Sequence, residues 1–102
     1  MLADGTPRRL HALGATGIGV SGLLALFRAR GWEVSGCDSR PSSALVAWLA
    51  SLGVTVDSGH DPAHIAKHRP DLVLRSPAVA DDHPELAAAQ AAGIPVDRKS
   101  VV

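Results

Sequence analysis

Hydrophobic and polar residues alternate along this chain in blocks of two kinds. Short apolar runs of strand length are followed by longer segments whose apolar residues recur at helical spacing, as at Val20, Leu23, Leu24 and Phe27. A segment of helical period leads from most of these runs to the next, which is typical of βαβ units and a parallel sheet. The pattern therefore predicts an α/β fold.

Five apolar runs are predicted strands, at residues 8–13, 32–37, 54–57, 71–75 and 94–97. Between them we predict three helices, which end near Gly31, Gly53 and Gly93, and a short helical turn over residues 63–67 that Pro62 starts. Parallel strands joined in this way carry helices on both faces of the sheet. We expect a Rossmann-like three-layer fold with a five-stranded parallel sheet.

Length and composition narrow the class of protein. A chain of 102 residues is long enough for one compact domain, and its ten basic residues balance ten acidic ones, which argues against a nucleic-acid or membrane-surface binder. Cys37 has no second cysteine to pair with, and neither a signal peptide nor a long apolar run is present. We therefore expect a cytoplasmic protein that binds any anionic ligand through local features.

The segment "LGATGIGVSG" follows the first predicted strand and holds four glycines within nine residues. A helix that begins after such a loop offers unpaired N–H groups and a partial positive charge to a phosphate. Two registers compete. Gly14-x-Thr16-x-x-Gly19 starts at the strand end, whereas Gly17-x-Gly19-x-x-Gly22 matches the dinucleotide fingerprint but begins three residues late. Geometry favours the first register, in which the Thr16 hydroxyl replaces the second glycine and could donate to a phosphate oxygen. Alternatively, the glycines serve only a tight turn and close packing.

Asp38 ends the second predicted strand, about twenty residues beyond the glycine loop, where the dinucleotide fingerprint places an acidic residue. Its carboxylate could accept hydrogen bonds from a ribose hydroxyl or a base N–H, or it could shape a turn or cap the next helix. Together with the later glycine register, Asp38 keeps open an alternative function: an NAD-binding domain of an oxidoreductase or a nucleotide sensor.

Several stretches, taken in order, resemble the N-terminal domain of the Mur ligases. They are "HALGATGIGVSGLLALFRARGWEVSGCD", "GHD", "LVLRSPAVADDHPELAAAQAAGIPV" and "DRK", which cover nearly the whole chain. The likeness is strongest to the branch of the family that adds L-alanine to UDP-N-acetylmuramate. The sequence departs from that branch's pattern at Thr16, Val20 and Pro77, and Pro77 removes a backbone N–H from its loop.

The resemblance implies a domain that binds the UDP part of UDP-N-acetylmuramate for an ATP-dependent ligase of peptidoglycan biosynthesis. It implies that the glycine loop holds the diphosphate, that Asp38 and Ser39 meet the uridine, and that His60 and the loop after the fourth strand complete the cleft. The site residues carried over are Thr16, Gly17, Ile18, Gly19, Ser21, Asp38, Ser39, His60, Ser76, Pro77 and Ala78.

No catalytic residue is predicted in this chain. It has no G-x-x-x-x-G-K-[ST] loop, and neither Lys67 nor Lys99 follows a glycine loop. In the family, ATP and Mg²⁺ bind a central domain and a C-terminal domain serves the amino acid. The chain stops where another element should begin, so we expect it to be one domain of a longer enzyme. We expect this domain to be inactive by itself and to need no cofactor or metal of its own. When isolated, the domain could form a homodimer.

The histidines are not predicted to bind a metal or to act as bases. His60, His64 and His68 recur every four residues, but Pro62 interrupts the helix that would align them, and without a third ligand His64 and His68 are predicted to be exposed. His11 lies within the first predicted strand, where a packed histidine is favoured over a catalytic base.

Structural roles are also predicted for the cysteine and for two neighbouring acidic residues. Cys37 lies on a predicted central strand without a catalytic partner nearby in sequence and is predicted to be a small buried residue. Asp81 and Asp82 precede Pro84, and we predict that they cap the helix that begins there rather than bind magnesium.

Overall fold

The computed structural model describes residues 8–17, 19–77 and 79–98. Strands and helices alternate along the chain as predicted, and observed bounds differ from the predicted ones by one or two residues. The elements are β1 (Arg9–Leu13), α1 (Val20–Ala29), β2 (Glu33–Asp38), α2 (Ser43–Ser51), β3 (Thr55–Ser58), α3 (Ala63–His68), β4 (Leu72–Arg75), α4 (Pro84–Ala91) and β5 (Val96–Arg98).

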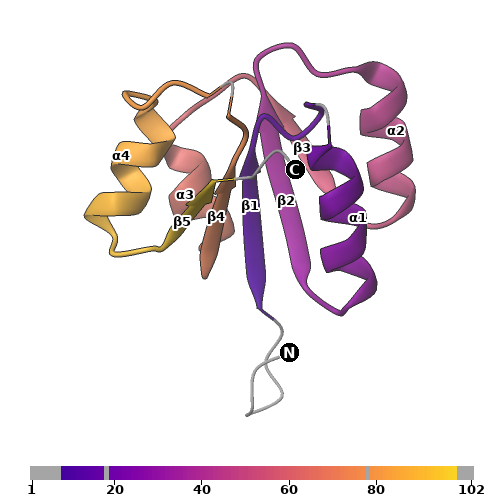
Figure 1. Ribbon diagram of the computed structural model, residues 1–102, viewed down its shortest axis with the longest axis horizontal. Helices are drawn as coiled ribbons and strands as arrows, with labels where there is room; N and C mark the ends of the chain where they lie inside the picture. The colour runs from indigo at the N-terminus through magenta and orange to yellow at the C-terminus, as the bar shows by residue number, and fades with distance from the viewer. Residues whose placement is uncertain (1–7, 18, 78, 99–102) are drawn as a thin grey trace.

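All the strands pair in parallel in a single sheet of order β3-β2-β1-β4-β5. Helices α1 and α2 cover one face of this sheet, and α3 and α4 cover the other (Figure 1). The predicted three-layer fold with a five-stranded parallel sheet is confirmed. The strand order places β1 at the centre, where the chain changes from building one half of the sheet to building the other.

Two apolar clusters hold the layers together. Because successive strand residues point to opposite faces, neighbouring β1 residues belong to different clusters. The cluster under α1 and α2 contains Leu10, Ala12, Ala15, Val20, Leu24, Val34, Leu49, Val54 and Leu74. The cluster under α3 and α4 contains Leu13, Cys37, Ile65, Val73, Leu86 and Ala89. Both faces of the central strands are buried, as parallel sheets require.

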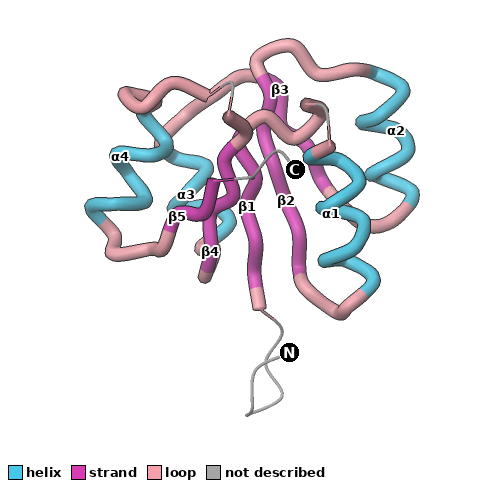
Figure 2. The backbone as a smooth tube through the Cα atoms, in the orientation of Figure 1, coloured by secondary structure: helices cyan, strands magenta, loops and turns pink. Residues whose placement is uncertain are grey.

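The loops that follow β1, β2, β3 and β4 all lie at one edge of the sheet, where the strands end (Figure 2). Open α/β sheets bind ligands at this edge, close to the strand where the order reverses. Within the described residues, no helix is long and apolar enough to cross a membrane.

Candidate functional site

The glycine loop adopts the earlier of the two predicted registers. Gly14 directly follows β1 with φ 79°, and Gly19 is the N-cap of α1 with φ 77°, so both lie in the left-handed region that strains residues with a side chain. Gly22, which the later register requires, lies inside α1 with open space around its Cβ position. The loop geometry therefore departs from the dinucleotide fingerprint.

Thr16 ties this loop to the end of β2. Its backbone N–H and its hydroxyl both donate to Oδ2 of Asp38, at 3.0 and 2.8 Å. The same hydroxyl oxygen accepts a hydrogen bond from the backbone N–H of Ser42 at 3.2 Å. In this structure the Thr16 donors are thus used within the protein and not for a phosphate.

Asp38 is held as a carboxylate at the rim of the loop. Burial alone would raise its pKa, but hydrogen bonds from Arg40 and Thr16 outweigh burial and lower the pKa. Oδ1 accepts from the backbone N–H of Arg40 at 3.0 Å, so one predicted role, shaping a turn, is confirmed. The predicted alternative of capping the next helix is wrong, because Ser42 is the N-cap of α2 and its side chain accepts from Leu45.

A cleft of about 280 Å³ opens between these loops at the carboxyl ends of the strands. This volume lies near the lower end of the range for small-molecule sites. Its lining residues are Gly14, Gly17, Asp38, Ser39, His60, Ser76, Val79, Ala80 and His83.

Five of the predicted site residues line this cleft: Gly17, Asp38, Ser39, His60 and Ser76. Four others, Thr16, Gly19, Ser21 and Pro77, lie in the same loops or in the first turn of α1 but are not among its lining residues. Ile18 and Ala78 lie outside the described residues.

Sequence reasoning missed His83, which lines the cleft and is the N-cap of α4. Its Nδ1 accepts a hydrogen bond from the backbone N–H of Glu85 at 3.1 Å, so Nδ1 carries no proton. The expectation that Asp81 and Asp82 cap this helix is wrong. Asp81 instead pairs with Arg75 at 2.8 Å, because Pro84 at the first helical position leaves His83 as the N-cap.

The Nε2 atom of His83 is buried and has no hydrogen-bond partner in the described part of the chain. Burial and the nearby His60 ring, whose centroid is 4.1 Å away, lower the pKa of His83. The ring is therefore neutral at neutral pH and carries its proton on Nε2. His83 lines the cleft, and no acceptor for its buried Nε2–H is present among the described residues.

Among the residues that the structure describes, no lysine or arginine lines the cleft. An anion bound there would be stabilised by the N-terminus of α1 and by neutral donors such as His83 Nε2–H. Gly19 carries no side chain that would separate a ligand from the first N–H groups of α1. The arrangement suits recognition of a phosphate compound.

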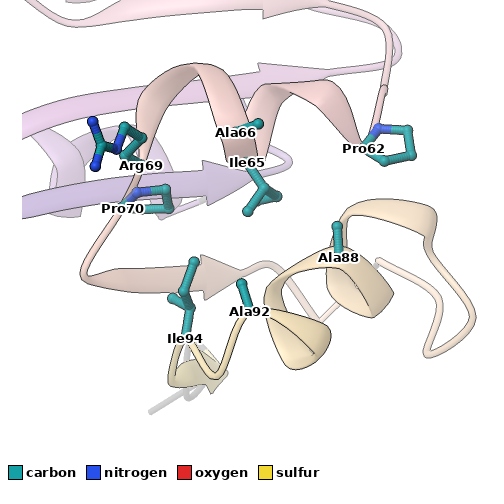
Figure 3. Close-up of a pocket in the computed structure, with 8 residues that line it drawn as sticks. All are labelled: Pro62, Ile65, Ala66, Arg69, Pro70, Ala88, Ala92 and Ile94. Atoms are coloured by element: carbon teal, nitrogen blue, oxygen red, sulfur yellow. The ribbon is translucent and has the colours of Figure 1, made fainter.

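A larger groove of about 520 Å³ lies elsewhere, between α3 and α4 (Figure 3). The described residues that line it are Pro62, Ile65, Ala66, Arg69, Pro70, Ala88, Ala92 and Ile94, and of these only Arg69 is charged. Size alone would favour this groove, but its walls are apolar and it lies away from the carboxyl ends of the strands. The smaller cleft is the better candidate for a polar ligand.

A buried polar cluster lies next to the cleft, and its centre is Glu85. Glu85 is fully buried, accepts from His11 Nε2 at 3.0 Å and from the Cys37 thiol at 3.0 Å, and has its pKa lowered to about 2 because these hydrogen bonds outweigh burial. The predictions that His11 and Cys37 are buried are confirmed. Burial, and then the bond to Glu85, raise the pKa of the Cys37 thiol.

The expectation that His64 and His68 are exposed is wrong. Their side chains are 14% and 17% exposed, because α3 packs against β1 and turns both rings towards the sheet. His64 Nδ1 lies 3.2 Å from Glu85, and His68 stacks on His11 with ring centroids 5.0 Å apart. Helix α3 follows Pro62 and is too short for its hydrophobic periodicity to show that His64 and His68 lie on the side facing the sheet.

Comparison with known proteins places this geometry in a family. Residues 9–102 match the family described as "Mur ligase family, catalytic domain". A UDP-N-acetylmuramate–L-alanine ligase from Acidothermus cellulolyticus is 47% identical over 88 residues, which are 86% of this chain and 18% of that protein. The chain thus spans about a fifth of the length of the curated relatives it matches.

Solved structures agree with the sequence relatives. A UDP-N-acetylmuramate-alanine ligase from Thermotoga maritima is similar with a TM-score of 0.78 and 31% identity, over 88% of this chain and 20% of that one. A UDP-N-acetylmuramate:L-alanyl-gamma-D-glutamyl-meso-diaminopimelate ligase from Neisseria meningitides gives a TM-score of 0.83 and 26% identity, over 91% of this chain and 29% of that one. With the family match over residues 9–102, these likenesses confirm the resemblance found in the sequence motifs, and the chain belongs to the Mur ligase family.

Proposed function

We propose that this chain is the substrate-recognition domain of an ATP-dependent ligase that joins L-alanine to UDP-N-acetylmuramate in peptidoglycan biosynthesis. The proposal is supported by relatives named for that reaction and by family membership. The observation that carries it is the convergence of Gly17, Asp38, Ser39, His60 and Ser76, from four separate loops, on one cleft. The chain alone binds the UDP-sugar and catalyses nothing.

The charges of the cleft orient the ligand. Asp38 is a carboxylate and would repel a diphosphate, so the diphosphate lies towards Gly17, Gly19 and the N-terminus of α1. The uridine then lies towards Asp38 and Ser39, where the carboxylate accepts from a ribose hydroxyl or the uracil N–H. His83 also lines the cleft, and its Nε2–H, which has no acceptor among the described residues, would donate to a ligand oxygen.

ATP and Mg²⁺ belong to the rest of the enzyme in this proposal. The chain has no glycine loop followed by lysine, and the described lining of the cleft holds a single carboxylate, that of Asp38. These residues do not fit a nucleoside triphosphate with its magnesium. The chemistry of amide formation is therefore assigned to a central ATP-binding domain and a C-terminal domain of a longer protein, with UDP-N-acetylmuramate presented by this one.

Titration of the ¹⁵N-labelled chain by NMR, with UDP-N-acetylmuramic acid, UDP and NAD in parallel, tests the proposal. We expect saturable shifts at Gly17, Asp38, Ser39 and Ser76 with the two uridine compounds and none with NAD. Shifts with NAD alone would establish the alternative dinucleotide-binding function. Absence of any shift with UDP-N-acetylmuramic acid would show that this domain does not recognise the substrate by itself.

A further inference from the structure

Next to the cleft, side chains from four different elements meet in the interior. His11 on β1, Cys37 on β2, His64 on α3 and Glu85 on α4 each contribute one potential ligand atom, and these atoms all lie within 4.8 Å of one another. His11, Cys37 and Glu85 are fully buried. We propose that these four residues form a binding site for one Zn²⁺ ion, independent of the nucleotide site.

The spacing of the ligand atoms suits a tetrahedral ion. Zn²⁺ bonds of about 2.0 to 2.3 Å to nitrogen, oxygen and sulfur place neighbouring ligand atoms roughly 3.4 Å apart. Glu85 Oε2 lies 3.0 Å from Cys37 Sγ and 3.2 Å from His64 Nδ1, and Glu85 Oε1 lies 3.0 Å from His11 Nε2. Small outward movements of the side chains admit the ion.

Hydrogen bonds alone do not account for the polar atoms that crowd Glu85 Oε2. Glu85 Oε2 is approached by Cys37 Sγ at 3.0 Å, Asp61 N at 3.1 Å, His64 Nδ1 at 3.2 Å and His60 Nδ1 at 3.4 Å. A carboxylate oxygen has about two lone-pair directions, so these four groups cannot all donate to it, and Cys37 Sγ also lies 3.1 Å from His60 Nδ1. An ion that replaces the protons of the thiol and of one imidazole nitrogen relieves this crowding and leaves the Asp61 N–H its acceptor.

An outer hydrogen bond holds His11 in the orientation that a metal requires. His11 Nδ1 lies 2.8 Å from Ser35 Oγ, which in turn lies 3.4 Å from the Leu10 carbonyl oxygen. With its proton on Nδ1, His11 donates to Ser35 and leaves the Nε2 lone pair for the ion. On His64, Nδ1 lies 3.2 Å from Glu85 Oε2, whereas Nε2 is 3.9 Å from Asp57 Oδ2, which is too far for a hydrogen bond.

The donor set selects the metal. One thiolate, two imidazoles and one carboxylate are ligands typical of Zn²⁺, whereas Mg²⁺ and Ca²⁺ take oxygen ligands. Thiolate and carboxylate together neutralise the charge of the ion, so the loaded site buries no net charge. Since all four ligands come from the protein, the site is closed and structural, and it links two strands to two helices.

Titration of the chelator-treated chain with Co²⁺ is the first test. We expect one equivalent to give the intense visible absorption of tetrahedral Co²⁺ together with a thiolate-to-cobalt charge-transfer band, and Zn²⁺ to displace it. Binding without the charge-transfer band, or no saturable binding, would overturn the proposal. Neither readout involves nucleotide, so the result is separate from that for UDP-sugar binding.

Variants test the ligand set. Outer-shell changes alone typically weaken metal binding 10- to 100-fold, so Cys37→Ser should lower the affinity for Zn²⁺ by about 100-fold or more and abolish the charge-transfer band. His64→Gln, at a partly exposed position, is the second ligand variant and should weaken binding even if Cys37→Ser folds poorly. Arg30→Gln, at an exposed position after α1 on the opposite face of the sheet, is the control and should bind Zn²⁺ like the unaltered chain. Unchanged Zn²⁺ affinity in both ligand variants would contradict the proposed site.

Discussion

Thr16 and Asp38 form a two-point contact that joins the glycine loop to the end of β2: Oδ2 of Asp38 accepts from both the backbone N–H and the hydroxyl of Thr16, at 3.0 and 2.8 Å. The threonine thus takes the place of a loop glycine and anchors the loop to the neighbouring strand. This contact also sets the Asp38 carboxylate at the rim of the cleft, so the shape of the glycine loop and the position of the proposed uridine contact depend on each other.

Thr16→Val, which keeps a β-branched side chain of similar size, tests the hydrogen bond made by the Thr16 hydroxyl. The variant loses the hydroxyl bond to Asp38 and the acceptor for the Ser42 N–H, and we expect the free energy of unfolding to fall by about 1 to 2 kcal/mol. Urea denaturation followed by circular dichroism measures this change. Thr16→Ser keeps the hydroxyl and is the control, and equal stability of the two variants would refute the anchoring role.

The two glycine registers make opposite predictions for two alanine substitutions. Gly19→Ala forces a side chain into the left-handed region at the N-cap of α1, so we expect a loss of about 1 kcal/mol and weaker UDP binding. Gly22→Ala places a better helix former in open space and should raise stability by roughly 0.5 to 1 kcal/mol with UDP binding unchanged.

Chemical denaturation and NMR titration of both glycine variants give these values. If Gly22→Ala abolished ligand binding while Gly19→Ala had no effect, the later register, and with it the dinucleotide fingerprint, would be correct.

The order of the elements could be predicted from the sequence because local signals agree with one another. The apolar runs of strand length, and glycines such as Gly31 and Gly53 that end helices in the left-handed conformation, each mark a boundary without reference to the rest of the chain. The last strand begins at Val96, two residues later than predicted. Pro95 has no N–H to give to the ladder, and its carbonyl oxygen still accepts from Val73.

The buried cluster could not be predicted in this way. His11, Cys37, His64 and Glu85 are far apart in sequence, and they meet only because the strand order puts β2 beside β1 and because α3 and α4 cover the same face. Glu85 looks like a favourable acid in the first turn of a helix, so its burial has no local signal. Residues of the cleft were easier to find, because the ends of parallel strands share one edge.

His83 combines two roles that substitutions can separate. His83→Ala removes both the N-cap acceptor of α4 and the Nε2–H donor in the cleft, so we expect a loss of about 1 kcal/mol in stability and several-fold weaker UDP binding. His83→Ser restores a side-chain cap but does not reach the ligand, so its stability should recover while its UDP affinity stays low.

Thermal unfolding and UDP titration of the two His83 variants provide the comparison. Asp82→Ala serves as the control for the helix cap and should change stability by less than about 0.5 kcal/mol. If Asp82→Ala were as destabilising as His83→Ala, the capping role assigned to His83 would be wrong.

Glu85 and His11 make the metal-free chain sensitive to acid in two successive ranges of pH. Burial lowers the pKa of His11 below its usual 6.5, so the folded state resists a proton that the unfolded chain accepts, and stability declines as the pH falls below 6.5. Hydrogen bonds lower the pKa of Glu85 from 4.5 to about 2, so its contribution is complete above pH 4.5 and is lost as the pH falls from there towards 2.

We therefore expect the free energy of unfolding of the chelator-treated chain to fall by at most about 1.4 kcal/mol per pH unit for each group, and by about 3 kcal/mol in all from Glu85. Urea denaturation at a series of pH values, in the presence of chelator, measures both ranges. Glu85→Gln keeps the shape of the side chain but does not titrate, so this variant should be less stable at pH 7 and should lose the Glu85 part of the dependence on pH below 4.5, while Asp38 and Asp57, whose pKa values are also lowered, keep theirs. A Glu85→Gln variant with the same acid dependence as the unaltered chain would show that other carboxyl groups cause the loss of stability.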